Sequence, residues 1–202
     1  MSAGLGNCVS EGDVLTRAES VLSERVVFTD SPDAMSESLV EVNLLELPSK
    51  IGKVVHVWTP GDIVPADWNR EKAIHVAFSA LRSLVRRSMP SRPNALSLSL
   101  LIGERAALEQ DATLGELCND TAYQEAVRYF GAGDPGLCSV CEAVAVACYY
   151  GARERWELIV PRVAWAIEQA GILLEGEGRA RKERVLMAWR LAEALGIDLP
   201  NA

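Results

Sequence analysis

Residues 135–170 decide the fold, and they read PGLCSVCEAVAVACYYGARERWELIVPRVAWAIEQA. This stretch is the longest apolar part of the chain that is rich in alanine and valine. Its first half spaces apolar side chains four, three and four residues apart, on one face of an α-helix: Leu137, Cys141, Val144 and Cys148. Asp134 and Pro135 form a typical helix start, and Gly151 is a typical helix end.

A second helix is predicted in the rest of this stretch. One of its faces carries large apolar side chains at helical spacing: Trp156, Val160, Val163 and Ile167. Gly171 is expected to end it. Pro161 either kinks this helix or begins it anew, because proline lacks a backbone N–H and crowds the preceding turn.

Composition limits the function classes. The chain has 202 residues, of which 49% are hydrophobic and 24% are charged, so it holds enough apolar material for one sizeable core. Its formal net charge is −8, which argues against general binding to nucleic acid or to anionic membranes. The acidic balance is compatible with a basic protein partner, but the preferred interpretation is that it simply keeps the chain soluble.

The N-terminal residues lack the basic and apolar runs of an export signal. No segment reaches the roughly 18 uninterrupted apolar residues of a membrane span. The chain contains five cysteines, and an odd number without an export signal is typical of reduced thiols in the cytoplasm.

The chain divides into three parts. Residues 1–10 are expected to be disordered, residues 11–62 to form a small α/β part, and residues 63–202 to form a helical domain. The α/β part begins with a helix predicted over Glu11–Ser23. Three strands are then expected, and together they would form a small antiparallel sheet: Val26–Phe28, Leu39–Leu47 and Val54–Trp58.

Several more helices are expected in the C-terminal part, at 67–87, 94–109 and 179–195. Asp67 is a plausible N-cap for the first of these. Thr113 and Thr121 each stand three residues before Glu or Gln, as in a capping box, and so predict two short helices that meet near residue 120. Residues 175–178 are expected to be a solvated loop. The predicted fold is therefore mainly α, with about six to eight helices and a small N-terminal antiparallel β element.

Cys138 and Cys141 form a CxxC pair near a predicted helix start, where the helix dipole can stabilise a thiolate. This pattern allows a redox or metal-binding site. However, Cys141 and Cys148 also lie on the apolar stripe, where cysteine acts as a small hydrophobe, and that interpretation is preferred. A zinc site would also need Cys118 to fold back, because the sequence offers no second CxxC and no HxxxH.

No catalytic constellation is recognised in the sequence. His56 and His75 are the only histidines, and neither has a nucleophile at a telling spacing. Three tryptophans are expected to anchor the helices in the core: Trp156, Trp165 and Trp189. Two basic clusters stand out in the acidic chain, and each is either a solvated helix end or a contact for an acidic group: Arg82, Arg86, Arg87 and Arg92, and then Arg179, Arg181, Lys182 and Arg184.

These observations favour a non-enzymatic, cytoplasmic protein–protein interaction module, such as an adaptor, an accessory protein or an inhibitor of a basic partner. No cofactor, metal ligand or catalytic residue is assigned. Four charged residues are the candidate partner-binding positions: Glu175, Glu177, Arg82 and Arg86. The alternative is a thiol redox or metal-binding protein that uses Cys138 and Cys141. A third hypothesis is an enzyme whose site is assembled from scattered residues.

Overall fold

The structure is a computed structural model. It describes residues 11–30, 38–52, 65, 68–89, 91, 94–153 and 155–199. Several predictions lie outside these residues, namely the N-terminal tail, the strand Val54–Trp58 with His56, and the positions of Asp67 and Arg92.

The described part of the chain forms eight α-helices, one 3-10 turn and two strands. In chain order they are α1 (Glu11–Leu22), β1 (Arg25–Asp30), β2 (Ser38–Asn43), α2 (Leu47–Lys50), α3 (Arg70–Ser88), α4 (Asn94–Glu109), α5 (Ala112–Gly131), α6 (Pro135–Gly151), η1 (Trp156–Leu158), α7 (Ile159–Glu175) and α8 (Glu177–Ala194). This mainly helical architecture with a small antiparallel β element confirms the predicted fold class.

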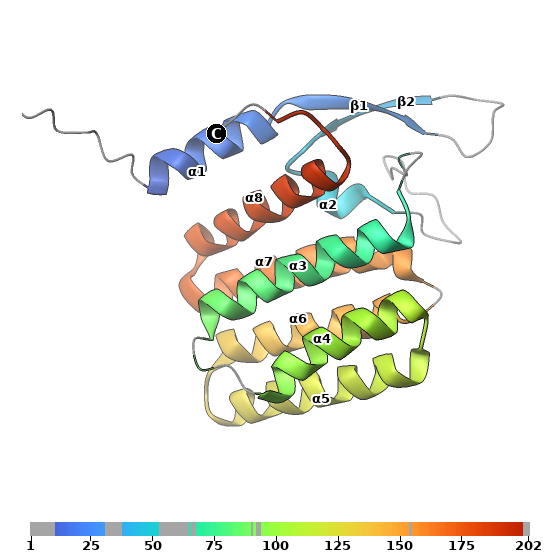
Figure 1. The fold of residues 1–202 in the computed structure, drawn as a ribbon. Coiled ribbons are helices and arrows are strands. Elements are labelled where there is room, and N and C mark those ends of the chain that lie inside the picture. The colour runs from blue at the N-terminus through green and yellow to red at the C-terminus, as the bar shows by residue number, and fades with distance from the viewer. Residues whose placement is uncertain are drawn as a thin grey trace, which may run out of the picture.

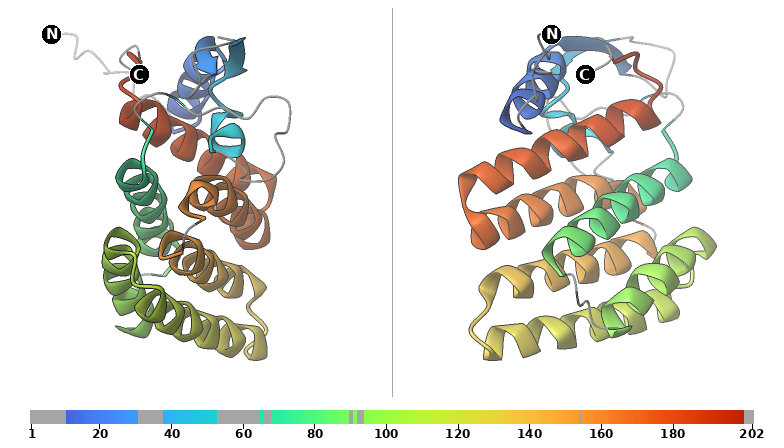
Figure 2. Two further views of the ribbon diagram at one scale, coloured as in Figure 1. Left: turned by 90° about the vertical axis from the view of Figure 1, so that its right-hand side faces the viewer. Right: turned by 60° about the vertical axis from the view of Figure 1, so that its left-hand side comes forward.

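The helices form two layers. α5, α6, α7 and α8 lie side by side in alternating directions, and each packs against the next along the chain (Figure 1). α3 and α4 cover one face of this layer, with α3 against α6, α7 and α8, and α4 against α5 and α6 (Figure 2). α1, α2 and the two strands gather at the α8 end. Apart from the short α2, which contacts α7, no described helix packs extensively on the opposite face of α5, α6 and α7, and this leaves room for a surface site.

The N-terminal β element is a two-stranded antiparallel sheet in which Arg25 is opposite Asn43. Its first strand and the preceding helix were predicted. The predicted second strand was too long, because it ends at Asn43 rather than at Leu47. The Asn43 side-chain oxygen accepts a hydrogen bond from the backbone N–H of Leu45 at 2.8 Å, which turns the chain into the short helix α2.

The prediction of two short helices in the region of α5 is wrong, because α5 is continuous from Ala112 to Gly131. Its N-cap is Asp111, whose side chain accepts from the N–H of Leu114 at 2.9 Å. The Thr121 hydroxyl donates to the Leu117 carbonyl at 2.8 Å, a bond within the helix rather than a cap. Continuous burial along one face spans the predicted break: Cys118, Ala122 and Ala126.

The predicted limits of α6 are confirmed. Asp134 caps it by accepting from the N–H of Leu137 at 2.9 Å, and Gly151 is its last residue. Pro161 proves to begin a helix rather than to kink one. It is the third residue of α7 and follows the 3-10 turn η1, so its missing N–H falls in a first turn, where no helical partner exists.

Gly171 does not end α7, and the expected loop at residues 175–178 is absent. α7 continues to Glu175, and α8 begins at Glu177 after the single linking residue Gly176, which has φ +81°. Gly171 is instead a close-contact position, because a Cβ added to it would lie 2.9 Å from the backbone of Ala180 on α8.

α3 begins at Arg70, with Asn69 as its N-cap, rather than at Asp67. The Arg70 guanidinium joins the C-terminal ends of two other helices. Its Nε donates to the carbonyl of Ala107 in α4 at 3.1 Å, and its Nη2 donates to the carbonyls of Gly151 and Arg153 at 2.8 and 2.9 Å. Burial lowers the Arg70 pKa from its usual value. These bonds satisfy carbonyls that a helix end leaves without a partner.

α4 and α6 approach closely at Gly103, where an added Cβ would lie 2.5 Å from the Cys148 Sγ. The Cys148 thiol points to the Ser99 carbonyl at 3.5 Å, so the inner face of α6 is fully engaged with α4. No helix in the described part of the chain is long and apolar enough to cross a membrane.

Candidate functional site

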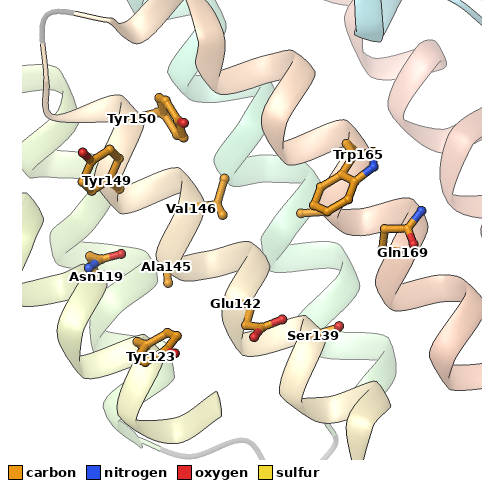
Figure 3. A pocket seen from close by; sticks show the side chains of 11 residues that line it. Asn119, Tyr123, Ser139, Glu142, Ala145, Val146, Tyr149, Tyr150, Trp165 and Gln169 are labelled. Carbon is orange, nitrogen blue, oxygen red and sulfur yellow. The ribbon is translucent and has the colours of Figure 1, made fainter. Parts of the chain in front are cut away.

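The candidate site is a groove on the uncovered face of α5, α6 and α7, with a volume of about 340 Å³ (Figure 3). Cys148 marks the side of α6 that faces α4, and the groove residues of α6 lie on the opposite side of the helix. We call this hollow the aromatic groove. Eleven side chains line it: Asn119, Tyr123, Ser139, Glu142, Ala145, Val146, Tyr149, Tyr150, Trp165, Ala166 and Gln169.

Four aromatic side chains from three helices converge on the groove (Figure 3). Trp165 on α7 is 64% exposed, Tyr123 on α5 is 56% exposed, and Tyr149 on α6 is 39% exposed. Tyr149 and Tyr150 contact each other edge to face, with ring centroids 5.2 Å apart. Large aromatic side chains that are this exposed on one surface are unusual in a protein that has no partner.

The exposure of Trp165 corrects the prediction that three tryptophans anchor the core. Trp156 and Trp189 are partly buried and pack against the core, as expected. Trp165 instead projects from the outer face of α7, where the short helix α2 contacts α7 but leaves the indole exposed.

Two of the groove's rings already hold cations from the same chain. The Arg153 guanidinium lies 4.0 Å from the centroid of the Tyr149 ring, and the Arg162 guanidinium lies 5.8 Å from that of Tyr150. Both distances are within the range of cation–π attraction. The Arg153 side chain also forms an ion pair with Glu116 at 3.5 Å. The aromatic surface is therefore suited to planar cationic groups.

The polar groups of the groove are few, and only one of them is acidic. Glu142 lies on α6, opposite Trp165 and Gln169 of α7 (Figure 3). It is exposed, and no cation among the described residues forms an ion pair with it. Asn119, Ser139 and Gln169 add neutral hydrogen-bonding groups. The groove thus combines aromatic faces with one carboxylate that has no counter-ion in the described part of the chain.

Below the groove, Cys138 and Cys141 are buried free thiols, as core packing predicts. Burial raises the pKa of both, and nearby Glu142 raises that of Cys138 further; the pKa of Cys141 rises to about 12. A reactive thiolate needs the opposite shift. Among the described residues, no group of three or more His, Cys, Asp or Glu side chains is arranged to hold a metal ion.

The four charged candidate positions do not lie in the aromatic groove. Arg82 forms an ion pair with Glu104 of α4, and the exposed Arg86 stands one turn later on α3. Glu175 pairs with Arg179 at 3.2 Å, and Glu177 is exposed at the start of α8. α3 ends and α8 begins on the same side of the molecule (Figure 1), and Arg86, Glu175 and Glu177 belong to these helix ends, whereas Arg82 lies six residues before the end of α3.

The basic cluster at the start of α8 is largely neutralised within the chain, as the contact with an acidic group predicts. The Arg179 Nε also contacts buried Glu183 at 2.8 Å, and Glu183 in turn pairs with Arg87 of α3 at 2.5 Å. Two further pairs reach other helices: Arg181 with Glu19 of α1, and Arg184 with Glu168 of α7.

A second hollow, of about 410 Å³, lies on the other side of Trp165. We call it the neutral groove. α7 and α8 form one wall, and β2 with α2 forms the other. Its lining residues are Asn43, Leu45, Glu46, Pro48, Ser49, Pro161, Ala164, Trp165, Glu168, Arg184 and Met187. Trp165 is common to both hollows.

The aromatic groove was not predicted, although the sequence carries a signal for it. Opposite the buried stripe of α6 runs a second stripe with the same spacing of four, three and four, which continues two residues past the end of the helix: Glu142, Val146, Tyr149 and Arg153. Comparisons with models of protein families, with curated proteins and with solved structures find no match for this chain. What the groove can bind therefore follows from its own chemistry.

Proposed function

We propose that the chain is a non-enzymatic protein-binding module whose aromatic groove takes a basic segment of a partner protein. The observation that carries this proposal is that the exposed rings of Tyr123, Tyr149 and Trp165 line the same groove as the carboxylate of Glu142. Aromatic faces together with a carboxylate attract arginine and lysine side chains, and the exposed rings also offer apolar area for their aliphatic stems.

The charge of the whole chain supports a basic partner. The chain has 28 acidic and 20 basic side chains, which gives the formal net charge of −8. A negative protein attracts a basic segment from a distance, and a carboxylate in the groove fixes where its cation comes to rest. The same balance disfavours nucleic acid, whose phosphates the protein would repel.

The contacts within the chain support a mode of binding for such a segment. Arg153 over Tyr149 and Arg162 over Tyr150 are guanidinium groups on the rim of the groove, each held against a ring. Trp165 has no such contact in the described part of the chain, and indole is the ring that binds cations best. An incoming arginine is therefore expected to stack on Trp165 and to reach Glu142 with its guanidinium.

The proposal also places the module in the cytoplasm. Cys118, Cys138, Cys141 and Cys148 are buried and unpaired, and this supports a compartment in which thiols stay reduced. The raised pKa values of Cys138 and Cys141 favour a packing role over the alternative redox function.

The test is the binding of a fluorescein-labelled hexapeptide of alternating arginine and leucine, followed by fluorescence anisotropy. Its matched control is the hexapeptide with glutamate in place of arginine. We expect saturable binding of the basic peptide alone, and weaker binding as salt rises. Trp165→Ala should weaken it about fivefold to thirtyfold, which corresponds to about 1–2 kcal/mol for a lost cation–π and stacking contact.

Two variants sharpen this test. Glu142→Gln keeps the shape of the side chain and removes its charge, and it should weaken the basic peptide about threefold to tenfold. Phe130→Ala is the control, because Phe130 is 73% exposed but does not line the groove. Equal binding of the acidic and basic peptides, or unchanged binding to Trp165→Ala, would show that the proposal is wrong.

A further inference from the structure

We infer that the bound segment is an extended chain that crosses Trp165 and occupies both grooves, with its basic residues in the aromatic groove and uncharged residues in the neutral groove. This inference rests on the proposed function and adds the conformation, length and polarity of the ligand. Its starting point is that Trp165 lines both hollows and is 64% exposed between them.

The two grooves differ in charge balance. In the aromatic groove, the carboxylate of Glu142 has no counter-ion among the described residues. In the neutral groove, Glu46 pairs with Lys50 at 2.8 Å, and Glu168 pairs with Arg184. A cationic side chain therefore gains more in the first groove than in the second.

The lining of the neutral groove suits apolar and small polar side chains. Leu45, Pro161 and Ala164 contribute apolar surface, and Met187 is buried at the base. Exposed Ser49 stands on the α2 side. A leucine or valine of the ligand would be largely removed from water here, and its neighbours in an extended chain would point to solvent.

The path sets the length of the ligand. It runs across the helices from α5 over α6 and α7 to α8, and neighbouring helix axes lie about 8–10 Å apart, which makes about 24–30 Å in all. An extended chain covers about 3.3 Å per residue, so about seven to nine residues span the path. A helical ligand is a straight cylinder about 10–12 Å wide, and it would rest on the Trp165 ridge without filling both hollows.

The experiment compares two labelled peptides with the full chain. One is the hexapeptide of alternating leucine and arginine that ends in arginine, and the other extends it by leucine, serine and leucine to nine residues, which matches the length of the path. We expect the longer peptide to bind at least about tenfold more tightly, since the added leucines enter the neutral groove. Trp165→Ala should weaken both peptides.

Variants in the neutral groove separate the two proposals. Ser49→Arg and Ala164→Gln each place a larger side chain in this groove, and each should remove the gain of the longer peptide while leaving the hexapeptide within about twofold of its affinity. Gln124→Arg is the matched control for an added arginine, because Gln124 is exposed on α5 and lines neither groove. Circular dichroism verifies that each variant is folded.

Each result decides one of the proposals. Equal affinities of the two peptides, or a gain that survives both neutral-groove variants, would overturn the crossing while hexapeptide binding still supports the proposed function. If neither peptide binds at concentrations up to about 1 mM, both proposals fail together.

Discussion

Arg70 offers the strongest test of the packing described above. Replacing it with methionine keeps the length and much of the apolar stem, but removes three hydrogen bonds to the C-terminal ends of α4 and α6. The partners are the carbonyls of Ala107, Gly151 and Arg153, at 3.1, 2.8 and 2.9 Å. These carbonyls would then face a partly buried space without a donor.

The expected loss of stability follows from the three hydrogen bonds and from the cost of burying the guanidinium. A hydrogen bond that involves a charged group contributes about 1.5–3 kcal/mol, and a cation at a helix C-terminus adds about 0.3–1 kcal/mol. The lowered pKa of Arg70 shows that burial offsets part of this gain. We therefore expect Arg70→Met to lower the free energy of unfolding by about 3 kcal/mol, a large part of the 5–15 kcal/mol typical of a domain.

Urea denaturation followed by far-ultraviolet circular dichroism measures this loss, with an unchanged m value as the sign that the folded and unfolded states keep their surfaces. Arg70→Lys should recover less than half of the loss, because one ammonium cannot reach three carbonyls from a single point. The control is Arg105→Met, which removes one exposed pair with Glu109 and should cost under about 0.5 kcal/mol. A loss below about 1 kcal/mol for Arg70→Met would refute this account of how the helix ends are joined.

Three further predictions concern packing, thiols and pH. Gly103→Ala should lower the free energy of unfolding by about 1–3 kcal/mol, because the added Cβ meets the Cys148 Sγ. In thermal melts, adding Cys148→Ala should restore part of the lost stability. Gly131→Ala is the control and should cost little, because nothing lies within 4 Å of the added Cβ. Cys8→Ser leaves four thiols, all of them buried: Cys118, Cys138, Cys141 and Cys148. Their alkylation at neutral pH should be slow in the folded state and fast in urea, because burial hinders access and raises the thiol pKa. One rapidly labelled position in the folded state would contradict this burial. The hydrogen bond from Arg181 lowers the Glu19 pKa below the usual 4.5. The stability that this pair contributes is therefore present above pH 4.5 and is lost as the pH falls through the lower pKa of the folded state. The difference in stability between wild type and Arg181→Gln should shrink in acid, and a constant difference would show that the pair is not coupled to folding.

The parts of the fold that are determined by residues close together in the sequence were predictable. The start of α6 is an example, because Asp134 and Pro135 act through the backbone of the same turn. Gly171 and Thr121 were misinterpreted for the opposite reason. Gly171 permits the close contact with Ala180, nine residues away on another helix, and burial against α6 keeps α5 continuous through Thr121. Local signals for a helix end are overruled when packing continues across them.

The candidate site was harder to predict than the fold. Tyr149 and Trp165 lie on helices whose other faces are buried, and the sequence does not say which face of a helix layer stays uncovered. The charged residues that stood out in the sequence, such as Arg179 and Glu175, largely satisfy each other within the chain. Surface aromatics carry more information here than surface charges, because helix ends commonly collect charges and rarely expose indole rings.

If the proposed function holds, the two opposite stripes of α6 separate folding from recognition. Its inner side chains, such as Val144 and Cys148, are fully buried, whereas Glu142 and Tyr149 contribute to the groove from the outer side. The outer positions can therefore change identity at little energetic cost to the scaffold. Such a surface can diversify quickly during evolution, and a combinatorial library randomised there would sample new specificities on an unchanged framework.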